Sequence, residues 1–264
     1  MNPLHPKILA DGTQVLESGL LASRRFPHAF STRIGPGGQS FDLARPGESF
    51  LGTSNQTLLD HLARFSRLLR SDAPEVATAR QVHGTAIMDG ARAGAAEADI
   101  VVSTSFDRAV AVRTADCVPI LIACPKTRIV AAVHAGWRGL VADAPGRAVW
   151  HLASLGADRK DLLAAIGPAI GLDRFEIGSE VADEFESSGL GSCIRIGSPR
   201  PHADLFNAAL RRLLAAGIPT ASIDGAPCCT SADPRFFSHR AESGRTGRHL
   251  SGIIGGKSPI DEGE

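Results

Sequence analysis

Two histidines and one cysteine are the residues of this sequence whose types best suit metal chemistry. His83, Cys117 and His134 each lie near glycine or proline at the end of an apolar run. Two imidazoles and one thiolate fill three positions around a tetrahedral Zn²⁺ and leave the fourth for water, which is the pattern of a catalytic zinc site. The three residues are far apart in the chain, unlike the close pairs of a zinc finger, so such a site has to be assembled at sheet edges.

Other chemistry is open to the same residues. Cys117 could be the nucleophile of a thiol hydrolase, with His134 as its base and no metal. Copper could take the place of zinc, because Cu(II) binds nitrogen ligands more tightly. The simplest alternative is that Cys117 is a small buried hydrophobe and that the histidines are unrelated to it. The metal content of protein purified without chelator would separate a metal site from a thiol hydrolase.

The elements on either side of Cys117 and His134 predict how the two meet. Residues 118–123 and 129–133 are short apolar runs rich in β-branched side chains, separated by residues 125–127, and they predict two adjacent buried strands. Cys117 precedes the first strand and His134 ends the second. In a tight hairpin both residues therefore come to the same edge of the sheet.

The segment that follows His134 predicts a strand, a glycine loop and a helix. Residues 135–139 contain two glycines and Arg138, and an apolar periodicity typical of one helix runs over residues 140–152. Such a junction presents free backbone N–H groups and the positive end of a helix dipole, which favours phosphate or another anion. Arg138 is accordingly a candidate for substrate binding.

Two arginine-containing segments at opposite ends of the chain add candidates. Arg33 follows a predicted strand at residues 28–32 and opens a glycine-rich loop, where it could contact an anionic substrate or simply be solvated. Residues 228–248 are polar, glycine-rich and heavy in arginine, and loops of that composition more often bind than pack. Arg240 and Arg248 lie in this segment, and we expect Arg33 and Arg248 to meet at one pocket.

Residues 80–84 look like a strand edge, and alternation would place Gln81 and His83 on one face of it. His61 is expected to be structural, on an amphipathic helix of residues 55–70 that Asn55 could cap. The remaining predicted elements are a peripheral hairpin (1–25), strands (98–102, 110–112, 162–166) and helices (179–185, and 205–216 capped by Asp204).

The amino-acid composition limits the classes of binding partner that we expect. Lys plus Arg equals Asp plus Glu at 28 each, so no basic field is available to recruit nucleic acid, and a small ligand is expected. Five cysteines are odd in number and too sparse for a disulfide framework, which indicates a reducing cytoplasm. No apolar run approaches the length that spans a bilayer, and no membrane association is expected. We expect a monomer or a weak homodimer.

Six blocks of the sequence resemble the signature of the YfiH family, which is also called the laccase-domain or peptidoglycan-editing-factor family. They run in order through most of the chain, and ADC and HAGWRG are the most distinctive motifs. The blocks are RQVHG (80–84), TADCVPIL (114–121), AAVHAGWRG (131–139), GPAIG (167–171), FEIGSEV (175–181) and the elements CT, FFSHR and TGR within 229–248.

The resemblance implies an α/β fold of the α+β type, a single domain over residues 1–264. Layered mixed β-sheets would be flanked by helices in an α/β/β/α arrangement, similar to that of a bacterial toxin deamidase with a Cys-His active site. It also implies a purine nucleoside enzyme: phosphorolysis of adenosine, inosine, guanosine and methylthioadenosine, with adenosine deamination as a further activity.

The same resemblance implies zinc held by His83, Cys117 and His134, with copper as a second candidate. We expect Arg33 to act in catalysis with these three residues. The side chains expected to bind purine nucleoside and phosphate are Gln81, Arg138, Arg240 and Arg248.

Two names carried by this family suggest further activities. A multicopper oxidase needs a copper with one Cys and two His, plus a cluster held by many more histidines, commonly in HxH pairs. This chain has nine histidines and no HxH pair, which disfavours that activity. The editing-factor name implies an amidase that removes a wrong amino acid from cell-wall precursors, and nothing in the sequence independently indicates that substrate.

Overall fold

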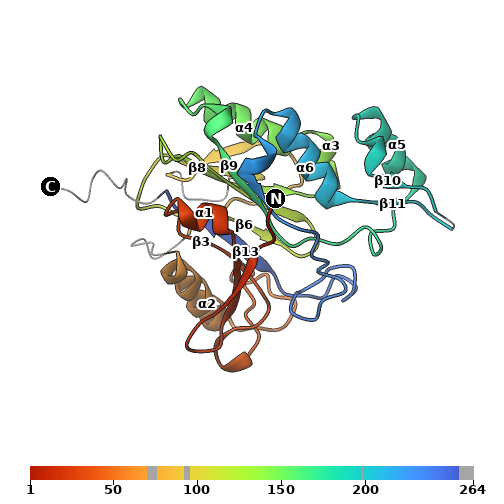
Figure 1. Ribbon diagram of the computed structural model, residues 1–264. Helices are drawn as coiled ribbons and strands as arrows, with labels where there is room; N and C mark the ends of the chain where they lie inside the picture. Colours follow the sequence, from red (N-terminus) through yellow and green to blue (C-terminus); the bar gives the residue numbers. More distant parts are fainter. Residues whose placement is uncertain (70–75, 92–95, 198, 256–264) are drawn as a thin grey trace.

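Two β-sheets stacked face to face organise the protein (Figure 1). The computed structural model describes residues 1–69, 76–91, 96–197 and 199–255. The apolar layer between the sheets draws on both of them, with Phe30 and Val112 from one and Val101, Leu121 and Ala165 from the other. This shared layer joins the sheets into one core.

The first sheet has five strands and is antiparallel throughout. Its first two strands pair with each other and form the predicted N-terminal hairpin at one edge of the sheet. Its last strand in the sequence lies between two strands from earlier in the chain. In spatial order the strands are β1 (His5–Ile8), β2 (Gln14–Glu17), β3 (His28–Ser31), β13 (His249–Ile253) and β6 (Val110–Thr114).

The second sheet has six strands and is mixed, because its two outermost pairs are parallel and the pairs between them antiparallel. Along its central strand, Ile120 and Ile122 face the helices while Leu121 and Ala123 face the other sheet. In spatial order the strands are β12 (Ile223–Asp224), β9 (Leu163–Ile166), β7 (Val118–Ala123), β8 (Val130–Ala135), β5 (Ile100–Ser103) and β4 (Ile87–Asp89).

Helices cover the outer faces of both sheets, which completes the predicted α/β/β/α layering (Figure 1). Phe65 and Leu69 pack from α2 and its end onto the five-stranded sheet. Leu140, Val149 and Leu213 lie in the apolar layer on the six-stranded sheet. The helices are α1 (Gly19–Ser23), α2 (Asn55–Leu68), α3 (Trp137–Val141), α4 (Ala144–Ser154), α5 (Ser179–Ser187) and α6 (Leu205–Ala215), and a separate pair of strands is β10 (Ile194–Arg195) and β11 (His202–Ala203).

The predicted hairpin of Cys117 and His134 is confirmed. β7 pairs with β8 in antiparallel register, with Val118 opposite Ala135 and Pro119 opposite His134. Asp204 caps α6 as expected, since its side chain accepts a hydrogen bond from Asn207 N. Local patterns were sufficient here because both features depend on residues close together in the chain.

Two expected elements differ from the structure. Residues 80–84 form no strand, because the backbone N–H groups of Val82, His83 and Gly84 donate to the carboxylate of Asp99 instead of to a neighbouring strand. The single helix expected over residues 140–152 is two helices, α3 and α4. The break lies at Asp143, whose backbone has a φ of 61° and whose side chain caps α4.

The ends of α2 differ slightly from expectation. Ser54 rather than Asn55 caps it, accepting a hydrogen bond from Thr57 N, and the expected end at Arg70 lies outside the described residues. His61 is structural as predicted, with Nδ1 2.8 Å from the carbonyl oxygen of Asp42.

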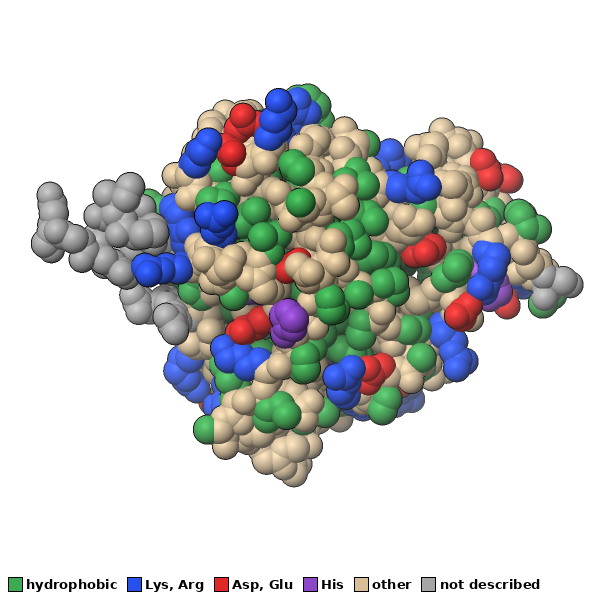
Figure 2. All heavy atoms as spheres, in the orientation of Figure 1, with side chains coloured by type: hydrophobic (Ala, Val, Ile, Leu, Met, Phe, Trp, Pro, Cys, Tyr) green, Lys and Arg blue, Asp and Glu red, His purple; other side chains and the backbone are tan. Residues whose placement is uncertain are grey.

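The surface gives no continuous field of one charge on the face shown in Figure 2, where Lys and Arg side chains lie among Asp and Glu. This distribution agrees with the balanced composition. None of the described helices combines the length and the apolarity needed to cross a membrane.

Candidate metal centre and substrate cavity

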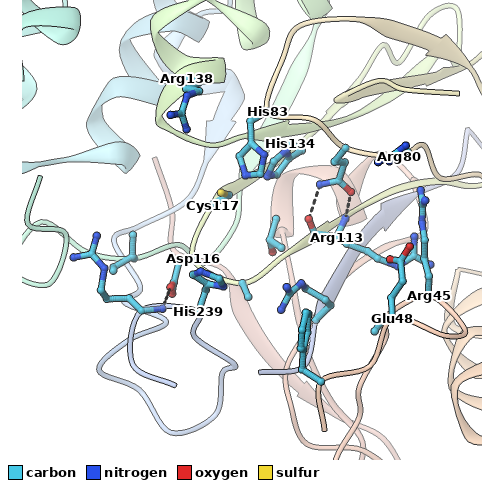
Figure 3. A pocket seen from close by; sticks show the side chains of 18 of the residues that line it. Arg45, Glu48, Arg80, His83, Arg113, Asp116, Cys117, His134, Arg138 and His239 are labelled. Atoms are coloured by element: carbon cyan, nitrogen blue, oxygen red, sulfur yellow. Dashed lines mark hydrogen bonds between the residues drawn. The ribbon is translucent and has the colours of Figure 1, made fainter. Parts of the chain in front are cut away.

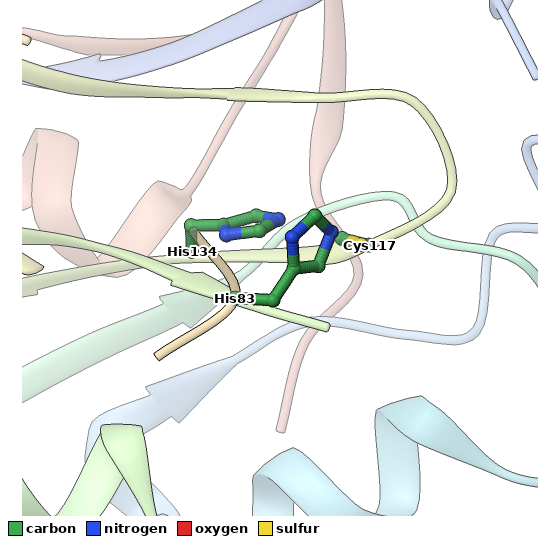
Figure 4. A group of neighbouring side chains, drawn as sticks. All are labelled: His83, Cys117 and His134. Atoms are coloured by element: carbon green, nitrogen blue, oxygen red, sulfur yellow. The ribbon is translucent and has the colours of Figure 1, made fainter. Parts of the chain in front are cut away.

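His83, Cys117 and His134 meet at one point, although they come from three different segments (Figure 4). His83 lies in the loop before β4, Cys117 in the connection between β6 and β7, and His134 near the end of β8. Their ligand atoms all lie within 4.8 Å of one another. The two imidazole rings are 4.9 Å apart at their centroids and meet edge to face.

Cys117 lies where the chain crosses from one sheet to the other, since β6 belongs to the five-stranded sheet and β7 to the six-stranded sheet. The crossing bends sharply at Asp116, which has a φ of 88°, a backbone conformation that is costly for a residue with a Cβ. The Asp116 carboxylate accepts hydrogen bonds from Thr230 Oγ1, Ser238 Oγ and Arg240 N. These bonds hold the bend that presents the thiol.

A single buried carboxylate, Asp99, positions both histidines. Its Oδ1 accepts hydrogen bonds from His134 Nδ1 at 2.6 Å and from His83 N at 3.0 Å, and its Oδ2 accepts from Gly84 N at 2.6 Å. The bond from Nδ1 leaves Nε2 of His134 to face the cluster. The bonds to the loop keep His83 at a φ of 61°.

Gly136 allows the three side chains to approach this closely. A Cβ at this position would lie 2.9 Å from Cδ2 of His83 and 3.0 Å from Sγ of Cys117. Real Cβ atoms do not come so near, so any larger residue would push the imidazole and the thiol apart. The glycine of the HAGWRG motif is thus part of the site.

The cluster shifts the ionisation of its own members. Burial opposes ionisation of the Cys117 thiol, but the charge of His134 and hydrogen bonds from both histidines outweigh burial and lower its pKa to about 6. For His134 the effect of burial is outweighed by the thiolate and by Asp99, which raise its pKa to about 9. Burial of Asp99 is likewise outweighed, chiefly by the bond with His134, and its pKa is lowered.

The donor set fits a metal ion. Two nitrogens and one sulfur are ligands that zinc and copper both accept, and the ligand atoms of a tetrahedral zinc lie about 3.3–3.6 Å apart when the bonds are about 2.0–2.3 Å long. The three atoms, which lie within 4.8 Å of one another, would have to draw together by about an ångström to hold the ion. The carboxylate behind His134 is the partner that metal-bound histidines usually have, and a thiol of lowered pKa supplies the thiolate that ligation requires.

The cluster opens into a cavity of about 780 Å³ (Figure 3). Volumes of this order are typical of sites for small organic ligands. Six arginines but only two carboxylates, Glu48 and Asp116, line the cavity. Apolar side chains complete the lining: Phe50, Trp137, Ile170, Phe175 and Leu205.

The expected substrate-binding residues Gln81, Arg138, Arg240 and Arg248 all line this cavity, whereas Arg33 is not among its lining residues. The Arg33 guanidinium lies 3.2 Å from Glu242 and 4.7 Å from the centroid of the Phe237 ring. Contrary to expectation, Arg33 therefore does not line the same cavity as Arg248.

Several residues of the site were not singled out from the sequence. Asp99 and Asp116 position the cluster, and Arg45 and Arg113 line the cavity. Arg113 carries a visible signal, because it is the one charge in the otherwise apolar strand VAVRT. His239 also lines the cavity and stands in the FFSHR block.

Fold and site together define a protein with two helix-flanked β-sheets and a His-Cys-His cluster that can bind a metal at the wall of a ligand-sized cavity. The chain belongs to the family described as multi-copper polyphenol oxidoreductase laccase, which it matches over residues 27–255.

A protein of Deinococcus radiodurans called purine nucleoside phosphorylase is 34% identical over 246 residues, covering 93% of this chain and 94% of that protein. A protein of the same description in Mycobacterium tuberculosis is 34% identical over 214 residues, covering 80% of this chain and 84% of that protein. Both alignments extend over most of the chain.

Solved structures confirm the YfiH-type fold and family. The hypothetical protein YfiH of Bacillus licheniformis superimposes with a TM-score of 0.82 at 25% identity, covering 94% of this chain and 98% of that one. YlmD from Geobacillus stearothermophilus superimposes with a TM-score of 0.83 at 26% identity, covering 97% and 100%.

Proposed function

We propose that this protein is a zinc-dependent purine nucleoside phosphorylase that also deaminates adenosine. Its substrates would be adenosine, inosine, guanosine and methylthioadenosine, together with inorganic phosphate. The relatives named purine nucleoside phosphorylase support the first activity, because their similarity extends over most of the chain. The metal would be held by His83, Cys117 and His134.

The observation that carries this proposal is the coexistence of two chemistries in one cavity. A cluster of soft metal ligands lies on one wall, and six arginines face only two carboxylates around the lining. A nucleoside brings an apolar, hydrogen-bonding base, and phosphate brings negative charge. Aromatic and aliphatic side chains such as Phe175 and Ile170 suit the base, and the excess of arginines suits the anion.

Phosphorolysis is a displacement at C1′ of the ribose. An oxygen of phosphate forms a bond to C1′ as the bond from C1′ to N9 of the purine breaks. The electron pair of that bond goes to the purine, which takes up a proton, so the products are ribose 1-phosphate and free base. The protein has to hold phosphate below C1′ and donate hydrogen bonds to the leaving purine, and arginine side chains can do both.

The cluster residues would orient a bound ligand and exclude water from around it. Asp99 holds the His134 ring, and Asp116 holds the backbone bend before Cys117, so neither side chain has to be ordered when substrate arrives. Zinc bound by the cluster would supply a Lewis acid, which deamination at C6 of adenine needs in order to activate water and phosphorolysis needs at most to polarise the purine.

A nucleoside panel tests the proposal directly. Purified protein is incubated with each nucleoside with and without phosphate, and bases, sugar phosphates and deaminated products are resolved. Free base and the corresponding sugar 1-phosphate, which is 5-methylthioribose 1-phosphate for methylthioadenosine, should form in equal amounts and only with phosphate, while inosine should form from adenosine in either case. Base released without phosphate would indicate hydrolysis, and a panel left unconsumed would contradict the proposal.

A metal-free thiol hydrolase is the second candidate, and the geometry of three residues favours it. Cys117, His134 and Asp99 are linked in the order of a nucleophile, a base and an orienting carboxylate, and the thiol has a pKa of about 6. Such an enzyme could act as an amidase. Chelation separates the candidates: activity that survives complete removal of metal, and that iodoacetamide abolishes, would support the thiol mechanism.

A further inference from the structure

Three arginines from separate segments converge on one side of the cavity. Arg45 lies in the loop after Leu43, Arg113 near the end of β6, and Arg248 just before β13. The backbone of Leu43 links two of them, because its carbonyl accepts a hydrogen bond from Arg113 Nε at 2.8 Å and its N–H donates to the carbonyl of Arg248 at 3.0 Å. We call Arg45, Arg113 and Arg248 the arginine wall.

Arg113 is the fixed member of the arginine wall. Its Nη1 donates to Thr78 Oγ1 at 2.9 Å, and the side-chain amide of Gln81 binds both the N–H and the carbonyl of Arg113. Among the described residues Nη2 has no hydrogen-bond partner. Burial and then the charge of Arg45 lower the pKa of Arg113 to about 10, so the guanidinium stays protonated at neutral pH.

The arginine wall has too little negative charge to balance it. Glu48 is the one carboxylate among the lining residues there (Figure 3). The carboxylate of Asp42 also lies nearby, where it accepts hydrogen bonds from Ala44 N, Arg248 N and Ser49 Oγ, so three guanidinium groups face two carboxylates. Neither Arg45 nor Arg113 forms an ion pair with a described residue. An excess of guanidinium groups held together in this way is the usual recognition element for a multivalent oxyanion.

Other arginines at the cavity are engaged differently. Arg80 lies 3.3 Å from Glu97, and Arg240 donates to the carbonyl of Glu176 at 3.1 Å. Arg138 stacks on the Trp137 ring, with Cζ 4.3 Å from its centroid. The arginine wall differs from these arginines because it brings guanidinium groups from three separate segments to one side of the cavity.

We infer that the arginine wall is the binding site for inorganic phosphate, the anionic co-substrate. This inference rests on the proposed function for the identity of the anion, while the charge arrangement holds for any tetrahedral oxyanion. The same chemistry could recognise the 5′-phosphate of a nucleotide. We assign inorganic phosphate to this site, and a nucleotide is the alternative ligand in the test.

The first experiment measures binding without turnover. Equilibrium dialysis with radiolabelled inorganic phosphate compares the metal-loaded parent with Arg45→Gln, which removes a half-buried loop side chain that has no described hydrogen-bond partner. Loss of charge-assisted hydrogen bonds should weaken phosphate binding about 10- to 100-fold. Arg67→Gln on the exposed side of α2 is the matched control, because it removes the same charge outside the cavity, and its affinity should equal that of the parent.

Equal phosphate affinity in the parent and Arg45→Gln would overturn the assignment. Arg113→Gln, checked for folding by circular dichroism, is the second variant, and it should lose at least as much affinity. Arg45→Lys keeps the charge without the planar fork and should recover only part of the affinity. AMP is the nucleotide arm: a parent that binds AMP, but not inorganic phosphate, at these arginines would also overturn the assignment.

The second experiment separates this inference from the proposed function. In phosphorolysis of inosine, Arg45→Gln should raise the KM for phosphate about tenfold or more and leave the KM for inosine unchanged. Phosphorolysis with an unchanged KM for phosphate would contradict the phosphate site at the arginine wall but not the proposed function. Phosphate binding that depends on Arg45 in a protein without phosphorolysis would support the site and contradict the proposed function.

Discussion

Two buried aspartates support opposite sides of the cavity, and they do so in different ways. Asp99 holds a side chain of the metal cluster directly, through the 2.6 Å hydrogen bond from Nδ1 of His134. Asp42 supports the arginine wall through the main chain, by accepting hydrogen bonds from the N–H groups of Ala44 and Arg248. In the described chain none of the hydrogen bonds of Asp42 comes from a guanidinium group.

The two sides of the cavity also differ in how strictly they are organised before a ligand arrives. The metal cluster is fixed at the level of its side chains, which suits an ion whose bonds have nearly constant length. The arginine wall is fixed unevenly, because the guanidinium groups of Arg113 and Arg248 donate hydrogen bonds while the end of Arg45 has no hydrogen-bond partner among the described residues. Such freedom suits an anion that enters as phosphate and has to leave as part of a sugar phosphate.

Removing the thiol should have the largest effect and should break the metal cluster alone. Cys117→Ala should lose its metal, lose adenosine deamination completely and keep a measurable remnant of phosphorolysis, since phosphate is already an ionised nucleophile. Metal analysis and the two assays check this, on protein whose folding is verified by circular dichroism. Cys228→Ala, a thiol outside the cavity lining, is the control and should keep its metal.

Equal loss of both activities from well-folded Cys117→Ala protein would contradict this division of labour. It would mean that the metal, or the thiol itself, takes part directly in both reactions.

Replacing each aspartate by asparagine should affect only the side of the cavity that it supports, and by less than the loss of the thiol. In Asp99→Asn a neutral amide replaces the carboxylate that accepts hydrogen bonds from His134 and from the loop of His83. The affinity for metal should therefore fall about 10- to 100-fold. Asp42→Asn should leave the affinity for metal unchanged and raise the KM for phosphate. Metal titration and initial rates measure the two effects, and identical profiles for the two variants would refute the distinction.

The stability of the protein should also depend on pH, through the histidine that follows Arg248. Phe237 N donates at 2.8 Å to Nε2 of His249, the residue that follows Arg248, and burial lowers the pKa of this imidazole to about 4. An unfolded histidine takes up a proton near pH 6.5, so stability is full above about pH 6.5 and falls as the pH drops toward 4, by up to about 3 kcal/mol.

Urea unfolding at pH 7.5, 5.5 and 4.5 measures this dependence, because the midpoint and slope give the free energy of unfolding at each pH. His249→Gln should be less stable at pH 7.5 but should lose part of the decline between pH 6.5 and 4. His5→Asn, which removes a surface imidazole, is the control. An unchanged decline in His249→Gln would rule out this histidine as its source.

The smallest effect is expected at Arg33, which lies beside Glu242 outside the cavity lining. Because this ion pair is partly exposed, Arg33→Gln should cost less than about 1 kcal/mol of stability. The KM values for nucleoside and phosphate should match those of the parent. A raised KM for phosphate in this variant would show that the anion contacts extend beyond the arginine wall.

How far the sequence could predict the site depended on the range of the contacts. The approach of Cys117 to His134 was predictable, because one short hairpin creates it. The role of Asp99 was not, because it requires β5 to pair with β8 and a separate loop to turn its N–H groups inward. The same loop explains why alternation failed at residues 80–84, where a carboxylate replaces the neighbouring strand.

The break between α3 and α4 did carry a local signal. Asp143 and Pro145 stand where an N-cap and the first helical turn would be, and that pair favours a new helix start over a continuous helix. The apolar periodicity of residues 140–152 passes through the break without interruption, because α3 and α4 both pack on the same sheet face. Periodicity alone therefore joined two helices into one.

The position of β13 also has a consequence for synthesis on the ribosome. β13 lies between β3 and β6, so until residue 253 has been made the five-stranded sheet has a gap between these two strands and two unpaired strand edges. Such edges are templates for pairing with other chains. The segment that fills the gap carries Arg248 directly before it, so the step that protects the nascent protein from aggregation also completes the arginine wall.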